Sequence, residues 1–353
     1  MSMAKYFNLT TNKMNIKFSY TKYLFLMMLM LGTMITINSS SWFNAWMGME
    51  INLMTFIPLM INKSMKNKIS NSMMIYFITQ ATASSMLMVM IIMLKINVEL
   101  GKSIIIMIML QFSLMIKLGG APMHWWLPKV TLNLSWMNCL IILTWQKIAP
   151  IFLINTINNN SMNYLMSILS VYMGSMLGLN QTSIKMIMTY SSVNHLGWML
   201  MTLIMNFKMM ILYFLIYSLI TTVNCMAMNN LNINYINQLF KINSQDFYSK
   251  IMVMMSLISL AGLPPLLGFL PKMITLIMMM KNNLFMESIL FITMATISMS
   301  YYMTPITSMM LMTSVNNKWN NKNPKIFKGI VCTLMINVMF IFIIATPLMN
   351  NFM

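Results

Sequence analysis

Residues 103–131 read SIIIMIMLQFSLMIKLGGAPMHWWLPKVT, and this stretch decides the fold. It is longer than the roughly 20 apolar residues that carry an α-helix across a bilayer. Gly119, Gly120 and Pro122 interrupt it, and the charged residue Lys117 stands just before the interruption. Non-helical backbone is tolerated at membrane depth only where it is buried in protein or lines a water-filled cavity. The stretch therefore predicts a discontinuous helix in a polytopic α-helical membrane protein.

The composition of the whole chain also indicates a membrane protein. Of its 353 residues, 59% are hydrophobic and only 7% are charged, and its mean hydropathy is +0.73. A soluble domain carries about 25% charged residues. The length accommodates about eleven spans of some 20 residues each. The predicted spans are 23–42, 44–61, 71–94, 103–131, 135–155, 161–179, 185–205, 208–230, 249–281, 284–313 and 326–346.

A second long span, 249–281, also contains a break, at Gly262, Pro264 and Pro265. In both broken spans the glycine and proline residues are followed by a Leu-Pro-Lys run. The two spans are an odd number of spans apart, so they are predicted to run in opposite directions through the membrane. This is the behaviour of inverted repeats, which secondary transporters use to build their sites at discontinuous helices.

The lysines outside the spans predict the topology. The formal net charge is +18, but the lysines cluster in short loops between apolar runs. That pattern is typical of topology signals and not of a nucleic-acid-binding face. If the spans alternate, most loop lysines fall on the side of the N-terminus, which predicts the N-terminus inside and the C-terminus outside. We expect a polar N-terminal extension at 1–20 and a single transmembrane domain at 21–353.

Some charged residues fall inside the predicted spans, where a charge costs about 2.5–3.5 kcal/mol or more. Away from the ends of the spans, these are Glu50, Lys117, Lys147 and Lys272. Burial disfavours the charged form of a carboxyl or an amine, and a nearby opposite charge favours it. A buried Glu–Lys pair can therefore exchange a proton when its partner moves, which predicts a proton relay. The alternative interpretation is a set of static ion pairs that fix the packing of the helices.

Both histidines lie in the same regions of the sequence. An imidazole titrates near neutral pH, so His124 and His195 are candidates for passing protons, or equally for structural hydrogen bonding. Neither has companions for a metal site. The sequence shows no glycine-rich nucleotide fingerprint and no cysteine cluster for iron–sulfur, so we expect no cofactor and no redox centre in this chain. The pair Tyr301-Tyr302 is interpreted as an interfacial belt or as helix packing.

Several motifs resemble, in order, those of one known family. They are Trp46-Met47-Gly48-Met49-Glu50-Ile51-Asn52, Lys117-Leu118-Gly119-Gly120-Ala121-Pro122-Met123-His124, Thr144-Trp145-Gln146-Lys147-Ile148-Ala149-Pro150, Tyr190-Ser191-Ser192 with His195-Leu196-Gly197-Trp198, and Gly262-Leu263-Pro264-Pro265 with Gly268-Phe269-Leu270-Pro271-Lys272. Together they are similar to the antiporter-like membrane subunits of respiratory complex I, the NADH:ubiquinone oxidoreductase. The resemblance implies that Glu50 and Lys117 form the acid–base pair of one half-channel. It further implies that Lys147 is the connecting lysine, and that Lys272 is the terminal lysine of the other half-channel.

The resemblance also implies an all-α antiporter-like bundle that translocates protons, coupled to electron transfer from NADH to ubiquinone elsewhere in the complex. NADH, FMN, the iron–sulfur clusters and ubiquinone would be bound by other subunits. The expected partners are other membrane-arm subunits and the lipid of the mitochondrial inner membrane, and not nucleic acid. Two alternatives stay open, a stand-alone cation/proton antiporter and a purely structural membrane-arm spacer.

Overall fold

The structure is a computed structural model, and it describes residues 2–61, 66–96, 103–157, 160–239, 247–264 and 266–311. Within these ranges every named element is an α-helix, and the β-type pairing is a single isolated bridge between Ser183 and Tyr235. The expected all-α fold is thereby confirmed. Helices long and apolar enough to cross a membrane occupy Tyr20–Ile37, Ile69–Ile96, Trp136–Asn155, Phe207–Leu231 and Phe285–Met309.

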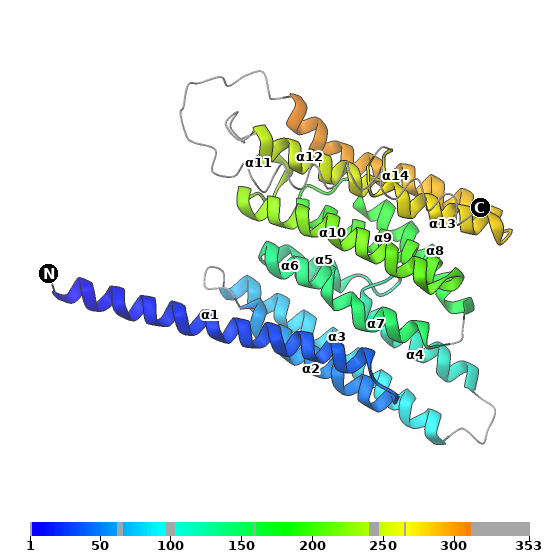
Figure 1. Ribbon diagram of the computed structural model, residues 1–353, viewed down its shortest axis with the longest axis horizontal. Helices are drawn as coiled ribbons and strands as arrows, with labels where there is room; N and C mark the ends of the chain where they lie inside the picture. The colour runs from blue at the N-terminus through cyan, green and yellow to red at the C-terminus, as the bar shows by residue number, and fades with distance from the viewer. Residues whose placement is uncertain are drawn as a thin grey trace. The chain divides into compact units, whose positions relative to one another are not determined.

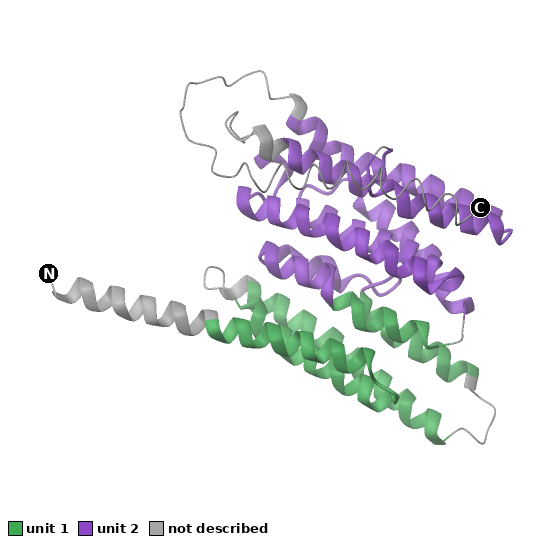
Figure 2. Ribbon diagram, in the orientation of Figure 1, with its two compact units in different colours: residues 1–118, 146–157 green, residues 119–145, 158–353 purple. Residues whose placement is uncertain are grey.

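The helices form two compact units, which are coloured separately in Figure 2. The first unit consists of residues 1–118 and 146–157. Its helices, labelled in Figure 1, are α1 (Ser2–Ile37), α2 (Trp42–Met60), α3 (Lys66–Ile96), α4 (Ser103–Leu118) and α7 (Trp145–Asn155). Helix α1 packs closely on α2 because Gly32 and Gly48 face each other. A Cβ on Gly48 would lie 2.8 Å from the Gly32 carbonyl oxygen.

The second unit consists of residues 119–145 and 158–353. Its helices are α5 (Trp126–Asn133), α6 (Trp136–Leu143), α8 (Asn160–Gly178), α9 (Ile184–Met205), α10 (Phe207–Leu231), α11 (Ile236–Leu239), α12 (Phe247–Ala261), α13 (Phe269–Lys281) and α14 (Phe285–Leu311). Helix α9 is buried along nearly all its length and packs against α5, α8, α10, α13 and α14. A helix surrounded by protein on all sides belongs to the interior of a bundle. Polar side chains on α9 are therefore held inside the protein.

Glycine lets α8 approach α9 very closely. A Cβ on Gly174 would lie 2.5 Å from the Asn194 nitrogen, and a Cβ on Gly197 would lie 2.4 Å from Ser170 Oγ. Small residues that allow backbones to approach are common at helix–helix interfaces within membranes. This contact fixes the position of the middle of α9, where His195 lies.

Helices end at both sequence breaks. Helix α4 ends at Leu118 and α5 begins at Trp126, while α12 ends at Ala261 and α13 begins at Phe269. One interruption was not expected, because the predicted span 135–155 is divided into α6 and α7 at Thr144. The Thr144 hydroxyl donates to the Leu140 carbonyl at 2.7 Å. Thr55 and Thr79 make the same bond inside unbroken helices, so this bond alone does not account for the break.

Parts of the sequence prediction lie outside what the structure describes. The predicted span 326–346 is among them, so the count of eleven spans stays a prediction. Helix α1 begins at Ser2, so residues 2–20, which were expected as an extension before the first span, are the first turns of the same helix. The division into an extension and one transmembrane domain likewise stays a prediction.

Candidate functional site

The first unit holds Glu50 on α2, Lys117 in the last turn of α4 and Lys147 on α7. Lys117 and Lys147 are buried, with 7% and 2% of their surface exposed. The charge of Glu50 is close enough to act on Lys117. Nevertheless, neither Lys117 Nζ nor Glu50 Oε1 has a hydrogen-bonding partner in the described part of the chain. The pair is therefore coupled electrostatically but is not closed as a direct hydrogen-bonded ion pair.

Amide side chains join the helices that carry these charges. The Gln146 amide donates to Asn52 Oδ1 at 2.9 Å, which joins α7 to α2. The Gln80 amide of α3 donates to the Lys117 carbonyl at 3.4 Å. The sequence interpretation gave these residues no role, although Asn52 and Gln146 stand next to the buried charges within the family motifs. In the sequence, each of these residues could be recognised as an amide within an apolar run. The bond between Asn52 and Gln146 holds together the helices that carry Glu50 and Lys147.

The second break holds the side chain of Lys272 in place. The buried Lys272 ammonium donates to the Ala261 carbonyl at 2.8 Å and to the Leu260 carbonyl at 3.4 Å. These oxygens lie at the C-terminal end of α12, where helix carbonyls lack intrahelical partners and carry partial negative charge. Gly262 has a φ of +81°, and a Cβ there would lie 3.0 Å from Lys272 Nζ. The partners of the Lys272 ammonium in this structure are thus backbone carbonyls.

His124 belongs to the connection between α4 and α5. It is buried, and its Nδ1 lies 3.2 Å from the Pro122 carbonyl oxygen. Its own carbonyl accepts the Leu127 N–H at 3.1 Å. Gly119 adopts a φ of +70°, and a Cβ there would lie 2.5 Å from the Leu127 side chain. These contacts give His124 a structural role in the turn between α4 and α5.

Gly120 and Pro264 lie in the described connections between helices, whereas Pro265 lies outside the described residues.

His195 lies in a cluster of buried tyrosines in the second unit. Its Nδ1 is 2.9 Å from the Tyr213 hydroxyl, and its ring is 5.1 Å from that of Tyr217. The Tyr217 hydroxyl donates at 3.3 Å to the carbonyl of Leu143, the last residue of α6. Tyr302 is also buried and lies close to both Tyr213 and Tyr217. We call His195, Tyr213, Tyr217, Tyr301 and Tyr302 the hydroxyl cluster.

The pair Tyr301-Tyr302 belongs to this cluster and not to an interfacial belt. The two rings are 4.6 Å apart, and each residue has no more than 2% of its surface exposed. The helix-packing interpretation of the pair is therefore confirmed. Sequence reasoning missed the polar character of the site, because a buried tyrosine in an apolar run is indistinguishable from a packing residue until its neighbours are known.

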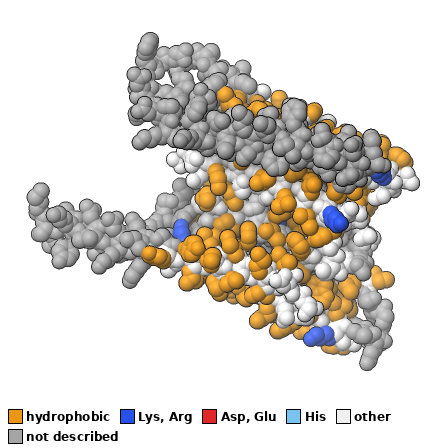
Figure 3. Space-filling view, in the orientation of Figure 1, with side chains coloured by type: hydrophobic (Ala, Val, Ile, Leu, Met, Phe, Trp, Pro, Cys, Tyr) orange, Lys and Arg blue, Asp and Glu red, His pale blue; other side chains and the backbone are white. Residues whose placement is uncertain are grey.

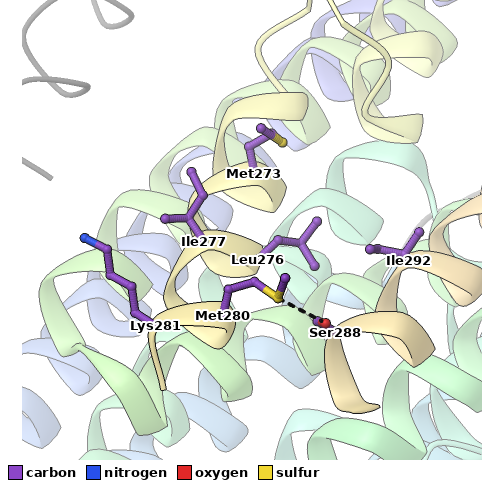
Figure 4. Close-up of a pocket in the computed structure, with 7 residues that line it drawn as sticks. All are labelled: Met273, Leu276, Ile277, Met280, Lys281, Ser288 and Ile292. Atoms are coloured by element: carbon purple, nitrogen blue, oxygen red, sulfur yellow. Dashed lines mark hydrogen bonds between the residues drawn. The ribbon is translucent and has the colours of Figure 1, made fainter. Parts of the chain in front are cut away.

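The surface differs from the buried sites. On the face drawn in Figure 3, hydrophobic side chains predominate among the described residues and lysines are scattered. A groove of about 520 Å³ lies between α13 and α14 (Figure 4), and its walls are Met273, Leu276, Ile277, Met280, Lys281, Ser288 and Ile292. Few polar groups point into this groove, so it lacks the converging polar side chains of a catalytic or ligand-binding site. Among the described residues no group of three or more His, Cys, Asp or Glu side chains could hold a metal ion.

Comparison with known proteins places the chain in a family. Residues 39–300 match the family described as NADH:quinone oxidoreductase/Mrp antiporter, TM. The chain belongs to this family. It is similar to NADH-ubiquinone oxidoreductase chain 2 of Anopheles gambiae, with 42% identity over 85% of this chain and 89% of the relative. The same protein of Locusta migratoria is 39% identical over 84% of this chain and 88% of the relative.

Solved structures agree on the fold. A chain of respiratory complex I from Thermus thermophilus superposes with a TM-score of 0.81 at 18% identity, covering 93% of this chain and 79% of that one. A chain of the Mrp complex from Dietzia gives a TM-score of 0.70 at 15% identity, covering 87% and 63%. The antiporter-like membrane fold is therefore established. The segment that matches the family contains Glu50, Lys117, Lys147, His195 and Lys272.

Proposed function

We propose that this chain is a membrane-arm subunit of mitochondrial NADH:ubiquinone oxidoreductase and translocates protons. The observation that carries the proposal is the Glu50–Lys117 pair, which is electrostatically coupled and yet lacks a hydrogen bond between its partners. Family membership and the names of the relatives support the assignment to this enzyme.

Glu50 is partly buried and Lys117 is buried, and a pair of this kind without a hydrogen bond is suited to proton exchange. At an effective dielectric constant of about 20, opposite charges 4 Å apart interact by about 4 kcal/mol. A change in their separation of a few ångströms alters that energy by more than the 1.4 kcal/mol that corresponds to a tenfold change in proton occupancy. Separating Glu50 from Lys117 would therefore release a proton from the lysine, and bringing them together would restore it. A closed ion pair would have to break its hydrogen bond first.

Lys272 would accept and release protons at the second break. The carbonyls of Leu260 and Ala261 stabilise an ammonium group there without the help of an acid. A neutral amine can still donate one hydrogen bond to Ala261, so the side chain keeps its position through a protonation cycle. In this proposal Lys147 connects the Glu50–Lys117 pair with Lys272, and His195 passes protons through its hydrogen bond to Tyr213.

The finer features of the assignment are part of the same proposal. The chain would have eleven spans with inverted repeats, its two discontinuous helices would lie at the Gly119 and Gly262 breaks, and its N-terminus would face the matrix. It would hold no redox centre, since NADH, FMN, the iron–sulfur clusters and ubiquinone would be bound by other subunits. Its partners would be other membrane-arm subunits within the mitochondrial inner membrane.

The test is to neutralise the pair in the assembled enzyme. Lys117→Met and Glu50→Gln should abolish proton translocation coupled to NADH oxidation, measured with a pH-sensitive dye in vesicles, while assembly is retained. Lys129→Met is the matched control, because Lys129 is an exposed lysine of the same predicted span. Normal translocation by assembled Lys117→Met enzyme would refute the proposal and favour the structural spacer.

A stand-alone cation/proton antiporter is the second candidate, because the description of the matching family also names the Mrp antiporter. The purified chain in proteoliposomes distinguishes the two functions. Proton movement that depends on a Na⁺ or K⁺ gradient would support the antiporter. A purified chain without such exchange, which is active only with its partner subunits, would support the complex I subunit.

A further inference from the structure

We infer that Asn224 is a positioning residue for Lys272 and that it acts through Ser256 of α12. This inference rests on the proposed function and deepens it, because it names what fixes the helix end that holds the lysine. Asn224, on α10, and Ser256 are both buried, with 0% and 1% of their surface exposed. The Ser256 hydroxyl donates to Asn224 Oδ1 and also lies 3.0 Å from the Val253 carbonyl of its own helix. The bond to Asn224 fixes α12 against α10, since a buried hydrogen bond between two helices makes their contact rigid.

The bond lies about one helical turn before the carbonyls that hold Lys272. Leu260 and Ala261 follow Ser256 by four and five residues, which is roughly 6 and 7.5 Å along the axis of α12. Helix α12 continues without a break to Ala261, and the N–H of Gly262 still donates back into the helix at 3.1 Å. Because this last turn is hydrogen-bonded throughout, a displacement of Ser256 is passed on to the carbonyls at its end.

Lys272 tolerates only a small displacement of those carbonyls. Its ammonium nitrogen lies 2.8 Å from the Ala261 oxygen and 3.4 Å from the Leu260 oxygen. An N–H···O bond is usually about 2.7–3.2 Å long, so the first bond is well formed and the second is already long. If the end of α12 moved away by about half an ångström, both bonds would lie outside the usual range. The bond between Ser256 and Asn224 therefore acts on Lys272 without touching it.

Helix α10 also contacts the other side of the break. Ile220 lies one turn before Asn224, and a Cβ on Gly268, the residue before α13, would lie 3.5 Å from Ile220 Cδ1. The same Cβ would overlap the Ser259 carbonyl, so the start of α13 lies directly against the last turn of α12. Helix α10 thus holds α12 through Asn224 and packs on the start of α13 through Ile220. Both contacts are needed, because Lys272 belongs to α13 and its carbonyl partners belong to α12.

The first break has a corresponding amide. Gln80 of α3 donates at 3.4 Å to the carbonyl of Lys117, in the last turn of α4. The spacing along the chain is nearly the same, since 39 residues separate Gln80 from Gly119 and 38 separate Asn224 from Gly262. In the predicted inverted repeats, α3 and α10 are the helices that precede the two broken spans.

The experiment compares Ser256→Val with Ser256→Thr in the assembled enzyme. The two new side chains have nearly the same shape, and only threonine keeps the hydroxyl that donates to Asn224. We expect Ser256→Val to translocate protons about tenfold more slowly than Ser256→Thr, because a hydrogen bond to a charged group contributes roughly that factor. NADH oxidation by a soluble artificial acceptor measures how much enzyme has assembled, and it should be equal in both variants. A purely structural defect would lower this oxidation together with translocation.

A second variant removes the same bond from the side of α10. Asn224→Leu should slow translocation by a similar factor. Its matched control is Asn163→Leu, because Asn163 is a similarly buried amide of this unit and neither of its amide atoms has a hydrogen-bonding partner among the described residues. The control should translocate protons like the wild-type enzyme. Adding Ser256→Val to Gly262→Ala should cost much less than tenfold, since Lys272 has already shifted in the Gly262→Ala enzyme.

Each result has a distinct meaning. Equal translocation by Ser256→Val and Ser256→Thr, or by Asn224→Leu and its control, would overturn the inference. Strict additivity of Ser256→Val with Gly262→Ala would overturn it as well, because the effect of Ser256 would then not pass through Lys272. Lys272→Met tests the proposed function separately, since normal translocation by that variant would remove Lys272 from the proton path. Loss of translocation in Lys272→Met, with equal rates for the two Ser256 variants, would refute the inference alone.

Discussion

Replacing Gly262 by alanine tests whether the second break positions Lys272. Gly262 has a φ of +81°, and a left-handed conformation costs a residue with a side chain about 1–2 kcal/mol. The new methyl group would lie 2.9 Å from Lys272 Cδ and 3.0 Å from Nζ, closer than ordinary van der Waals contact. Lys272 must therefore shift, which weakens its hydrogen bond to the Ala261 carbonyl, now 2.8 Å long. A hydrogen bond to a charged group contributes about 1.5–3 kcal/mol, so the total loss is at most about 5 kcal/mol.

The assay measures protons translocated per NADH oxidised in proteoliposomes, together with the midpoint of thermal inactivation. Gly262→Ala should lower both quantities. Gly119→Ala is the matched control, since Gly119 also has a left-handed φ, +70°, but a Cβ there meets Leu127 and no lysine. The control should lose about 2–5 kcal/mol of stability, from left-handed strain and overpacking against Leu127, and retain more of its translocation. Assembled Gly262→Ala enzyme with wild-type translocation, or with no greater loss than Gly119→Ala, would refute the reasoning.

Four further variants test three contacts that hold the sites together. Asn52→Leu and Gln146→Leu should show a coupling of about 0.5–1.5 kcal/mol in a double-mutant cycle of thermal stability, and strict additivity would show that their hydrogen bond contributes nothing. Gly48→Ala places a methyl 2.6 Å from a side chain of α1 and should destabilise the enzyme by about 1–3 kcal/mol, so unchanged stability would contradict this close packing. Tyr213→Phe deprives His195 of its partner and should cost about 1–3 kcal/mol and slow translocation, and wild-type values of both would exclude His195 from the path.

The helices could be predicted well from the sequence because lipid imposes a simple rule. A backbone in hydrocarbon must satisfy its own hydrogen bonds, so a long apolar run forms a helix. The predicted span 208–230 corresponds to α10 at Phe207–Leu231. Glycine and proline likewise marked the ends of α4 and α12. The division at Thr144 could not be predicted, because no glycine or proline marks it, and threonines with the same hydroxyl bond stand in unbroken helices at Thr55 and Thr79.

The buried charges could also be found in the sequence, but their partners could not. A lysine inside an apolar run is costly to insert, and that cost singles out Lys117, Lys147 and Lys272. The partner of Lys272 is a pair of backbone carbonyls, which every residue possesses and no residue type reveals. The partner of His195 is Tyr213, which in the sequence reads as an ordinary apolar residue of another helix.

The sequence by itself determined that the chain is helical, that it lies in a membrane, and which residues carry charge there. These properties follow from transfer free energies, which depend on each residue and its neighbours along the chain. Only the tertiary structure decided that Glu50 and Lys117 lie near each other without a hydrogen bond, that carbonyls hold Lys272, and that His195 meets Tyr213. Those features arise where side chains from different helices meet, and the local pattern of a sequence does not specify which helices pack together.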